Sequence, residues 1–395
     1  MNESKAFRFN SEPENQKYLD TLDYSMNIIA DGSNLQMKHL FDAGNPGKIQ
    51  HMNTRTGRYS LGPNYAPGDV GLLIGRLWLL FLYTGKTQFE EWALHLIKQT
   101  KEDLLNNASF NDASTLDIFF GLNHTAKITG FEKWKSLFSQ ISSNISNEFW
   151  NESAQCFFSG NDEEKQLSMD LTGGMIALHS ENISEKSKER LIAHFDRTLD
   201  LNMIRTDGSV RQCAIFDSSN NFSHYSTNHG YEVFDSVAKT HASTMLNFIS
   251  VYELTGHQRF LNQIIKLANY WCDSIPEDWV PRYDFTDPDP KTKPKDSCAA
   301  SIAVVAMIRL CKIRPELNVH YRLVIEETLK TLSKKYLAEG GILLHSSWGD
   351  QRWHSALKFE PTPSNLVFPQ EEILPFGNYF FVEAIFRELK PDENI

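Results

Sequence analysis

A threonine–glycine pair recurs after apolar helical segments, and this repeat constrains the fold of the 395-residue chain more than any other feature. The pairs, with the aromatic residue after each, are Thr84-Gly85 with Phe89, Thr129-Gly130 with Phe131, and Thr255-Gly256 with Phe260. Glycine readily adopts the left-handed conformation that ends a helix, so each pair predicts a helix end, a turn and a new helix. The first two pairs lie 45 residues apart, which fits one helical hairpin and its return. The repeat predicts stacked hairpins, in either an open solenoid or a closed ring.

Apolar residues at three- and four-residue spacing support this interpretation over most of the chain. They predict helices at 70–83, 89–105, 245–254, 260–271, 299–310 and 324–332. Strand-like runs are short, and the clearest cover residues 213–216 and 341–345. Because no linker rich in proline or glycine divides the chain, we expect a single domain over residues 1–395. About the first 20 residues are expected to form an irregular extension of that domain.

The charge balance excludes several kinds of partner. The chain has 39 Lys and Arg against 50 Asp and Glu, a formal net charge of −11. This acidity argues against nucleic acid as a partner, and no basic run could anchor the chain to an anionic membrane. The sequence also lacks the ~18–20 successive apolar residues of a membrane span. Its N-terminus has no apolar run typical of a signal peptide, so we expect a cytoplasmic protein, or a periplasmic one whose leader has been removed.

The five cysteines are far apart and form no CxxC motif, which predicts buried free thiols rather than disulfides or a zinc site. Three histidines, His224, His229 and His241, lie near the middle of the chain without an HExxH motif, so no metal is predicted. No phosphate loop or dinucleotide fingerprint occurs, so no cofactor is predicted. Lys239 and His241 are candidates to contact an anionic, hydroxylated ligand. Arg205, in an RTDGS turn, is a candidate for the wall of a cleft or for a surface ion pair.

Two aspartates stand in apolar surroundings and are candidates for catalysis. Asp117 lies within STLDIFF, where the flanking residues predict a buried helix. A carboxylate there is costly to desolvate unless it is paired, hydrogen-bonded or protonated. Asp170 precedes an apolar segment in SMDLTGGMIAL, where it could cap a helix. A carboxyl group that holds its proton in such a place would instead suit general acid–base chemistry.

A series of motifs occurs in a fixed order along the chain: GRLWLLFLYTGK, TLDIFFGL, SMDLTGGMIAL, RTDGS, NHGYEVFDSVAK, LTGHQRFL, IPEDWVPRYDF and DSCAASIA. In this order the chain resembles the unsaturated glucuronyl hydrolases, glycoside hydrolase family 88. The unsaturated rhamnogalacturonyl hydrolases, family 105, are near relatives. The resemblance runs from about Tyr65 to Leu389 and is most specific over 254–302. It implies an all-α (α/α)6 toroid, six helical hairpins in a ring with short β-hairpin insertions, and metal-free chemistry.

The resemblance also implies a reaction. The family removes a 4,5-unsaturated uronic acid from the non-reducing end of oligosaccharides that a polysaccharide lyase has made. An aspartate protonates C4 of the vinyl ether and activates water for attack at C5, and the hemiketal then collapses. By their motifs, Asp170 matches this general acid/base and Asp117 matches its carboxylate partner. A neighbouring carboxylate favours the protonated form of such an acid, so we expect the two side chains to lie together.

The motifs that bind substrate in the family are altered in this chain. The family's Trp-Ala-Arg-Gly-Gln-Ala-Trp reads Val-Ala-Lys-Thr-His-Ala-Ser over 237–243, so Lys239 replaces the arginine and His241 the glutamine. The family's Thr-His-Gln-Gly-Tyr reads Thr-Asn-His-Gly-Tyr over 227–231, which moves the histidine by one position. The substrate contacts that the resemblance implies are Lys239, His241, His229, Arg205 and Tyr231. Lysine cannot reproduce the bidentate grip of arginine on a carboxylate, which predicts a changed specificity.

Two other functions stay open at this point. The same toroid also carries conventional two-carboxylate glycosidases and sugar epimerases, and an epimerase would use His229 and His241 as its bases. The chain could also be an inactive saccharide-binding protein. We expect an oligosaccharide with an unsaturated uronate end as its partner.

Overall fold

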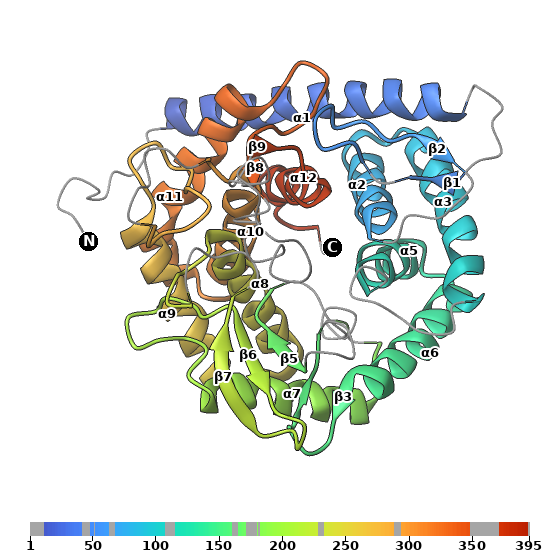
Figure 1. Cartoon of the computed structure of the whole chain (residues 1–395). Helices are drawn as coiled ribbons and strands as arrows, with labels where there is room; N and C mark the ends of the chain where they lie inside the picture. Colours follow the sequence, from blue (N-terminus) through green and yellow to red (C-terminus); the bar gives the residue numbers. More distant parts are fainter. Residues whose placement is uncertain are drawn as a thin grey trace, which may run out of the picture.

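The computed structural model describes residues 12–41, 48–50, 52–62, 68–106, 115–159, 165–170, 180, 182–227, 233–287, 294–347 and 371–393. Helices form most of these residues and are arranged in two concentric layers around a ring (Figure 1). The outer helices are α1 (Glu12–Phe41), α3 (Thr87–Asn106), α6 (Glu132–Phe149), α7 (Glu185–Asp200), α9 (Gln258–Ser274) and α11 (Asn318–Thr331). The inner helices are α2 (Asp69–Thr84), η2 (Asp117–Asn123) with α5 (His124–Thr129), α8 (Ala238–Thr255), α10 (Ser297–Ile313) and α12 (Pro375–Leu389). Two short elements, η5 (Pro315–Leu317) and η6 (Leu332–Tyr336), flank α11.

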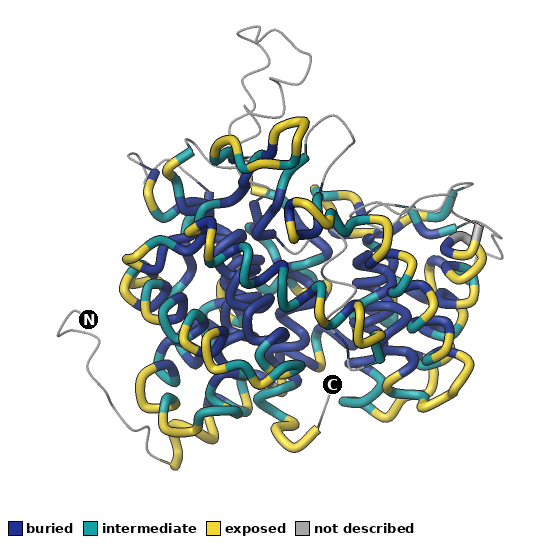
Figure 2. The backbone as a smooth tube through the Cα atoms, turned by 90° about the horizontal axis from the view of Figure 1, so that it is seen from below, coloured by how far each residue is buried: buried dark blue, intermediate teal, exposed yellow. Residues whose placement is uncertain are grey.

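Burial separates the two layers. The inner helices are buried on nearly every side, as in α2, where each residue over 70–80 is buried. The outer helices bury one stripe, as in α9, where Phe260, Ile264, Leu267 and Trp271 face the core. Figure 2 shows the same division, with buried residues inside and exposed residues along the outer turns. Segments of the sequence that are apolar throughout therefore form inner helices, and amphipathic segments form outer helices.

The three Thr-Gly pairs end helices as the repeat predicts. Gly85, Gly130 and Gly256 follow α2, α5 and α8, and each has a positive φ between 66° and 69°. In each pair the threonine hydroxyl donates to the carbonyl four residues earlier, at 2.7 Å. Of the three aromatic residues that follow, Phe89 and Phe260 are buried, whereas Phe131 is 54% exposed.

Short antiparallel strands occupy the connections between helices. The one three-stranded sheet among the described residues has the order β5-β6-β7, with Ser168 opposite Cys213. Its strands are β5 (Gln166–Ser168), β6 (Cys213–Phe216) and β7 (Phe222–Ser226). The paired strands elsewhere are β1 (Lys48–Ile49) with β2 (Leu61–Gly62), β3 (Trp150–Asn151) with β4 (Cys156–Phe157), and β8 (Ser346–Ser347) with β9 (Glu371–Glu372). Asp170 comes two residues after β5, so this sheet helps to position it.

The structure confirms the all-α toroidal fold with short β-hairpins, all six predicted helical segments and the strand at 213–216. The predicted strand at 341–345 is wrong, because Leu343 forms only an isolated bridge to Leu337 before β8 begins. The predicted irregular extension is also wrong from Glu12 onward, where α1 begins. Tyr18, Leu22 and Met26 are buried on one face of α1, but the many polar residues between them hid this stripe.

The five cysteines are free thiols; Cys311 is partly buried and the other four are buried. No described helix is both long enough and apolar enough to cross a membrane.

Candidate active site

The first residues of the inner helices meet at one end of the ring. Asp117, the first residue of η2, contacts the start of α2. Lys239, in the first turn of α8, lies close enough to Asp296, the N-cap of α10, to interact with its charge. A helix N-terminus carries a partial positive charge, so this end of the ring favours negatively charged groups. Both predicted catalytic aspartates lie here, since Asp170 contacts Thr240 in the first turn of α8.

Asp170 is held by two side chains from different parts of the chain. Its carboxyl group belongs to a residue that is only 9% exposed. The hydroxyl of Thr240 donates to Oδ1 at 2.6 Å, and Nε2 of Gln212 donates to Oδ2 at 2.8 Å. Gln212 is oriented in turn by Thr227, whose hydroxyl donates to Oε1 at 2.7 Å. Both carboxyl oxygens of Asp170 therefore have a fixed partner.

These two partners differ in what they permit. An amide nitrogen can only donate, so Gln212 requires Oδ2 of Asp170 to remain an acceptor. A hydroxyl group can donate or accept, so Thr240 can serve Oδ1 either as a carboxylate oxygen or as a protonated one. The arrangement therefore allows Asp170 to gain and lose a proton at Oδ1 without losing a hydrogen bond. This property suits a general acid that becomes a general base within one cycle.

Asp117 is completely buried and caps α2 from a neighbouring element. Its Oδ2 accepts the backbone N–H of Gly68 at 2.8 Å, and its Oδ1 accepts that of Gly71 at 2.6 Å. These N–H groups belong to the start of a helix, where no intrahelical acceptor is available. Gly71 also permits a close approach of α2 to η2, because a Cβ there would lie 2.3 Å from Cα of Asp117. Asp117 therefore stabilises the inner ring whatever it does in catalysis.

The described contacts of the two aspartates have no residue in common. Asp170 is linked to α8 and to the start of β6, whereas Asp117 is linked to α2. Both are buried, as the apolar flanks predict. Their direct pairing stays a prediction that rests on the resemblance.

Lys239 is buried beside the residue that contacts Asp170. Its Nζ donates to the carbonyl of Ser347 at 3.4 Å. The backbone N–H of Ser347 donates to Oδ1 of Asp296 at 3.4 Å, while Oδ2 of Asp296 is buried without a hydrogen bond. Burial raises the pKa of Asp296, and the positive charge of Lys239 opposes that shift. Lys239 thus shares the first turn of α8 with Thr240, and its described contacts lead to Ser347 and Asp296.

His241 does not fit its predicted role in substrate binding. It is completely buried, and its Nε2 lies 3.0 Å from the carbonyl oxygen of Leu267 on α9. Its ring stacks on Tyr270 with centroids 5.1 Å apart. Burial lowers the pKa of His241 to about 4, so the ring is neutral near pH 7. This is the environment of a core histidine between two layers, and we correct the prediction accordingly.

Arg205 braces a turn in the structure. Its guanidinium donates to the hydroxyl of Ser209 and to the carbonyl of Val210, at 3.1 and 3.3 Å. It also donates to the carbonyls of Phe234 and Asp235, at 2.9 and 3.3 Å. Because the guanidinium of Arg205 is already hydrogen-bonded to these groups of the chain, the contacts do not favour its predicted role in substrate binding. The other two predicted contacts, His229 and Tyr231, lie outside the described residues.

Three residues of this site escaped the sequence-based prediction. Thr240 lies within the altered segment at 237–243, where the family motif has a glycine. This replacement of a glycine by a residue with a hydroxyl group was the signal that could have indicated Thr240. Gln212 directly precedes the predicted strand at 213–216, but nothing in its sequence context indicates a contact with Asp170. Asp296 begins the DSCAASIA motif, where the pattern of small residues indicates only a helix start. Among the described residues, no group of three or more His, Cys, Asp or Glu side chains is arranged to hold a metal ion.

Comparison with known proteins gives a consistent result. No protein-family model matches the sequence. An unsaturated glucuronyl hydrolase of Formosa agariphila is 23% identical over 336 residues, which span 80% of this chain and 79% of that protein. An unsaturated chondroitin disaccharide hydrolase of Streptococcus agalactiae is 25% identical over 217 residues, 52% of this chain and 50% of that protein.

Solved structures agree in fold at low sequence identity. An unsaturated glucuronyl hydrolase from Streptococcus agalactiae superposes with a TM-score of 0.79 and 18% identity, over 98% of both chains. The enzyme of that name from Bacillus sp. GL1 gives a TM-score of 0.77 and 18% identity, over 95% of this chain and 97% of that one. These similarities confirm the resemblance that the motifs predicted, and they confirm the helical ring.

Proposed function

We propose that this chain, which resembles the unsaturated glucuronyl hydrolases in sequence and in fold, is a glycoside hydrolase for lyase-generated oligosaccharides. It would remove the 4,5-unsaturated uronic acid from their non-reducing end. The observation that carries this proposal is the setting of Asp170. Its nearly buried carboxyl group has an amide donor on Oδ2 and a reversible hydroxyl partner on Oδ1.

In the proposed reaction Asp170 acts first as an acid. The Oδ1 proton turns from the Thr240 hydroxyl toward C4 of the sugar and moves to it, and the electron pair of the C4=C5 bond forms the new C–H bond. Positive charge spreads over C5 and the ring oxygen, and the Thr240 hydroxyl donates to the carboxylate that is left. Asp170 then takes a proton from water as the water oxygen bonds to C5. The resulting hemiketal opens to a keto acid, and the remaining saccharide is released.

We assign the binding of the uronate carboxylate to Lys239. Its position beside Thr240 supports this assignment, as does the positive end of α8 at which it lies. A lysine ammonium is a point charge with three donors, whereas arginine offers a planar fork. We therefore expect Lys239 to hold the substrate carboxylate less rigidly than an arginine at this position would.

The geometry weakens one of the two alternatives, and the choice of substrate tests the other. An epimerase would need His241 as one of its bases, and that ring is buried against α9. A conventional glycosidase would use two carboxylates about 5–9.5 Å apart on either side of a saturated linkage. Such an enzyme would act on saturated glycosides, so its substrates separate it from the proposed hydrolase.

The test is spectroscopic. The full chain is incubated with a panel of unsaturated disaccharides prepared by polysaccharide lyases, and the ultraviolet absorbance of the conjugated alkene is followed. Loss of absorbance with release of the second sugar supports the proposal. Absorbance that stays constant across the panel contradicts it, and hydrolysis of saturated glycosides alone would favour the conventional glycosidase. Binding without turnover would identify a saccharide-binding protein.

A further inference from the structure

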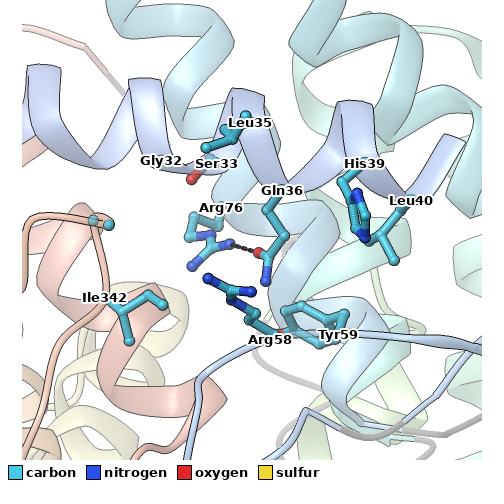
Figure 3. A pocket seen from close by; sticks show the side chains of 12 residues that line it. Gly32, Ser33, Leu35, Gln36, His39, Leu40, Arg58, Tyr59, Arg76 and Ile342 are labelled. Carbon is cyan, nitrogen blue, oxygen red and sulfur yellow. Dashed lines mark hydrogen bonds between the residues drawn. The ribbon is translucent and has the colours of Figure 1, made fainter. Parts of the chain in front are cut away.

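A cavity of about 300 Å³ lies between α1, α2 and the loop at Ile342 (Figure 3). Its volume is at the lower end of the range for small-ligand pockets, roughly 300–1,000 Å³. The residues that line it include none of the described hydrogen-bond partners of Asp170 or Asp117. Tyr59 lies close enough to Asp117 to interact with its charge, but no residue of the cavity has a described contact with Asp170, to which the proposed hydrolysis assigns the proton transfer.

Arg76 brings an uncompensated positive charge to this cavity. The residue is only 4% exposed, and its Nε is buried without a hydrogen-bond partner. Its described hydrogen bond is a long one, from Nη2 to Oε1 of Gln36 at 3.4 Å. No carboxylate among the described residues forms an ion pair with it. Burial lowers the pKa of Arg76, which reflects the cost of a buried charge without a counterion.

A second guanidinium faces the same space. In Figure 3, Arg58 projects into the cavity below Arg76, and Gln36 lies beside Arg76. No described hydrogen bond or ion pair involves the Arg58 side chain. The buried Arg76 and the exposed Arg58 repel each other, and an anion between them would stabilise both. Tyr59 also lines the cavity, and burial together with the charges of Asp69 and Asp117 raises its pKa, so its hydroxyl stays neutral.

The apolar residues that line the rest of the cavity indicate which kind of anion would fit it. Leu40 and Ile342 supply apolar side chains to this wall, and Leu35, which is 72% exposed, also borders the cavity. A free inorganic ion would leave this apolar surface uncovered, whereas a small organic acid would cover it with its body. A guanidinium can hold a carboxylate through two parallel hydrogen bonds. We propose that this cavity binds a small organic acid, with its carboxylate between Arg58 and Arg76 and its apolar body against α1.

Calorimetry and thermal unfolding on the full chain test this proposal with benzoate as the probe. Benzamide, its uncharged isostere, and sodium sulfate serve as comparison ligands. We expect saturable binding and a raised Tm with benzoate, and neither with benzamide. Arg58→Gln should weaken benzoate binding at least tenfold, because it removes one of the two charges. Since Arg58 is exposed, this variant is expected to fold even where Arg76→Met does not.

Two control variants test whether benzoate binding depends on this cavity. Arg314→Gln removes an exposed arginine that pairs with Glu316 outside the cavity, and it should bind benzoate like the unaltered chain. Asp170→Asn should also bind benzoate normally, so this test stands apart from that of the hydrolase function. No saturable benzoate binding, or equal binding by Arg58→Gln, would overturn the proposal. Sulfate binding as tight as benzoate binding would overturn the choice of an organic acid in favour of an inorganic oxyanion.

Discussion

Thr240→Val removes a hydrogen bond from Asp170 while keeping the shape of the side chain. The hydroxyl lies 2.6 Å from Oδ1 of Asp170, and Thr240 is almost completely buried in the first turn of α8. Valine would leave Oδ1 without this donor in a site that is only 9% exposed. A hydrogen bond to a charged group contributes about 1.5–3 kcal/mol. In the proposed cycle this donor is needed most once the proton has left Asp170.

The loss should therefore raise the activation barrier by about 1.5–3 kcal/mol, since the bond strengthens as negative charge develops on Asp170. Each 1.36 kcal/mol is a factor of ten, so kcat should fall by about 10- to 150-fold. The assay is the initial rate of alkene absorbance loss at saturating substrate, with Tm measured in parallel.

Two companion variants separate this effect from a structural one. Thr240→Ser keeps the hydroxyl and should recover most of the lost rate. Thr244→Val removes a hydroxyl one turn later on α8, which donates to the carbonyls of Met169 and Thr240 and not to Asp170. Its kcat should stay close to that of the unaltered chain. If Thr240→Val keeps the original kcat, or if the serine variant is equally slow, Thr240 does not assist Asp170.

Two further predictions concern stability. Asp117→Asn should lower the free energy of unfolding by about 1–3 kcal/mol, because its one amide oxygen can replace only one carboxylate oxygen and its NH2 group cannot accept the other N–H. Urea denaturation measures this, and an unchanged value would refute the capping role. The second follows from burial, which lowers the pKa of His124 and of His241 to about 4, below the value of about 6.5 in an unfolded chain. As the pH falls from 6.5 to 4, the unfolded state binds more protons, so this contribution to stability is present above pH 6.5 and is lost on acidification. His241→Gln should reduce the slope of Tm against pH over that range, and an unaltered slope would contradict this assignment.

The parts of the fold that follow from local sequence could be predicted. A Thr-Gly pair can end a helix without help from distant residues, because the glycine conformation and the threonine hydrogen bond are both local. The burial of Asp117 and Asp170 could likewise be inferred from apolar neighbours along the chain. Helix α1 was harder, since its stripe of buried residues is diluted by polar ones.

The contacts of the site depend on residues that are distant in sequence. Gln212 and Thr240 lie 42 and 70 residues from Asp170, and no local pattern predicts that they meet. The error at His241 has a simple geometric cause. Successive residues of a helix point about 100° apart. When Thr240 faces Asp170, its neighbour His241 therefore faces away, and it packs against α9.

The central claim is that Asp170 transfers the proton, and Asp170→Asn tests it most directly. Asparagine fits the site, because its carbonyl oxygen can accept from Gln212 while its NH2 group donates to the Thr240 hydroxyl. We therefore expect an unchanged Tm and a rate of alkene loss at least about 100-fold lower, the scale of general acid–base catalysis. A variant that folds equally well and still consumes the unsaturated disaccharide at the original rate would contradict the assignment.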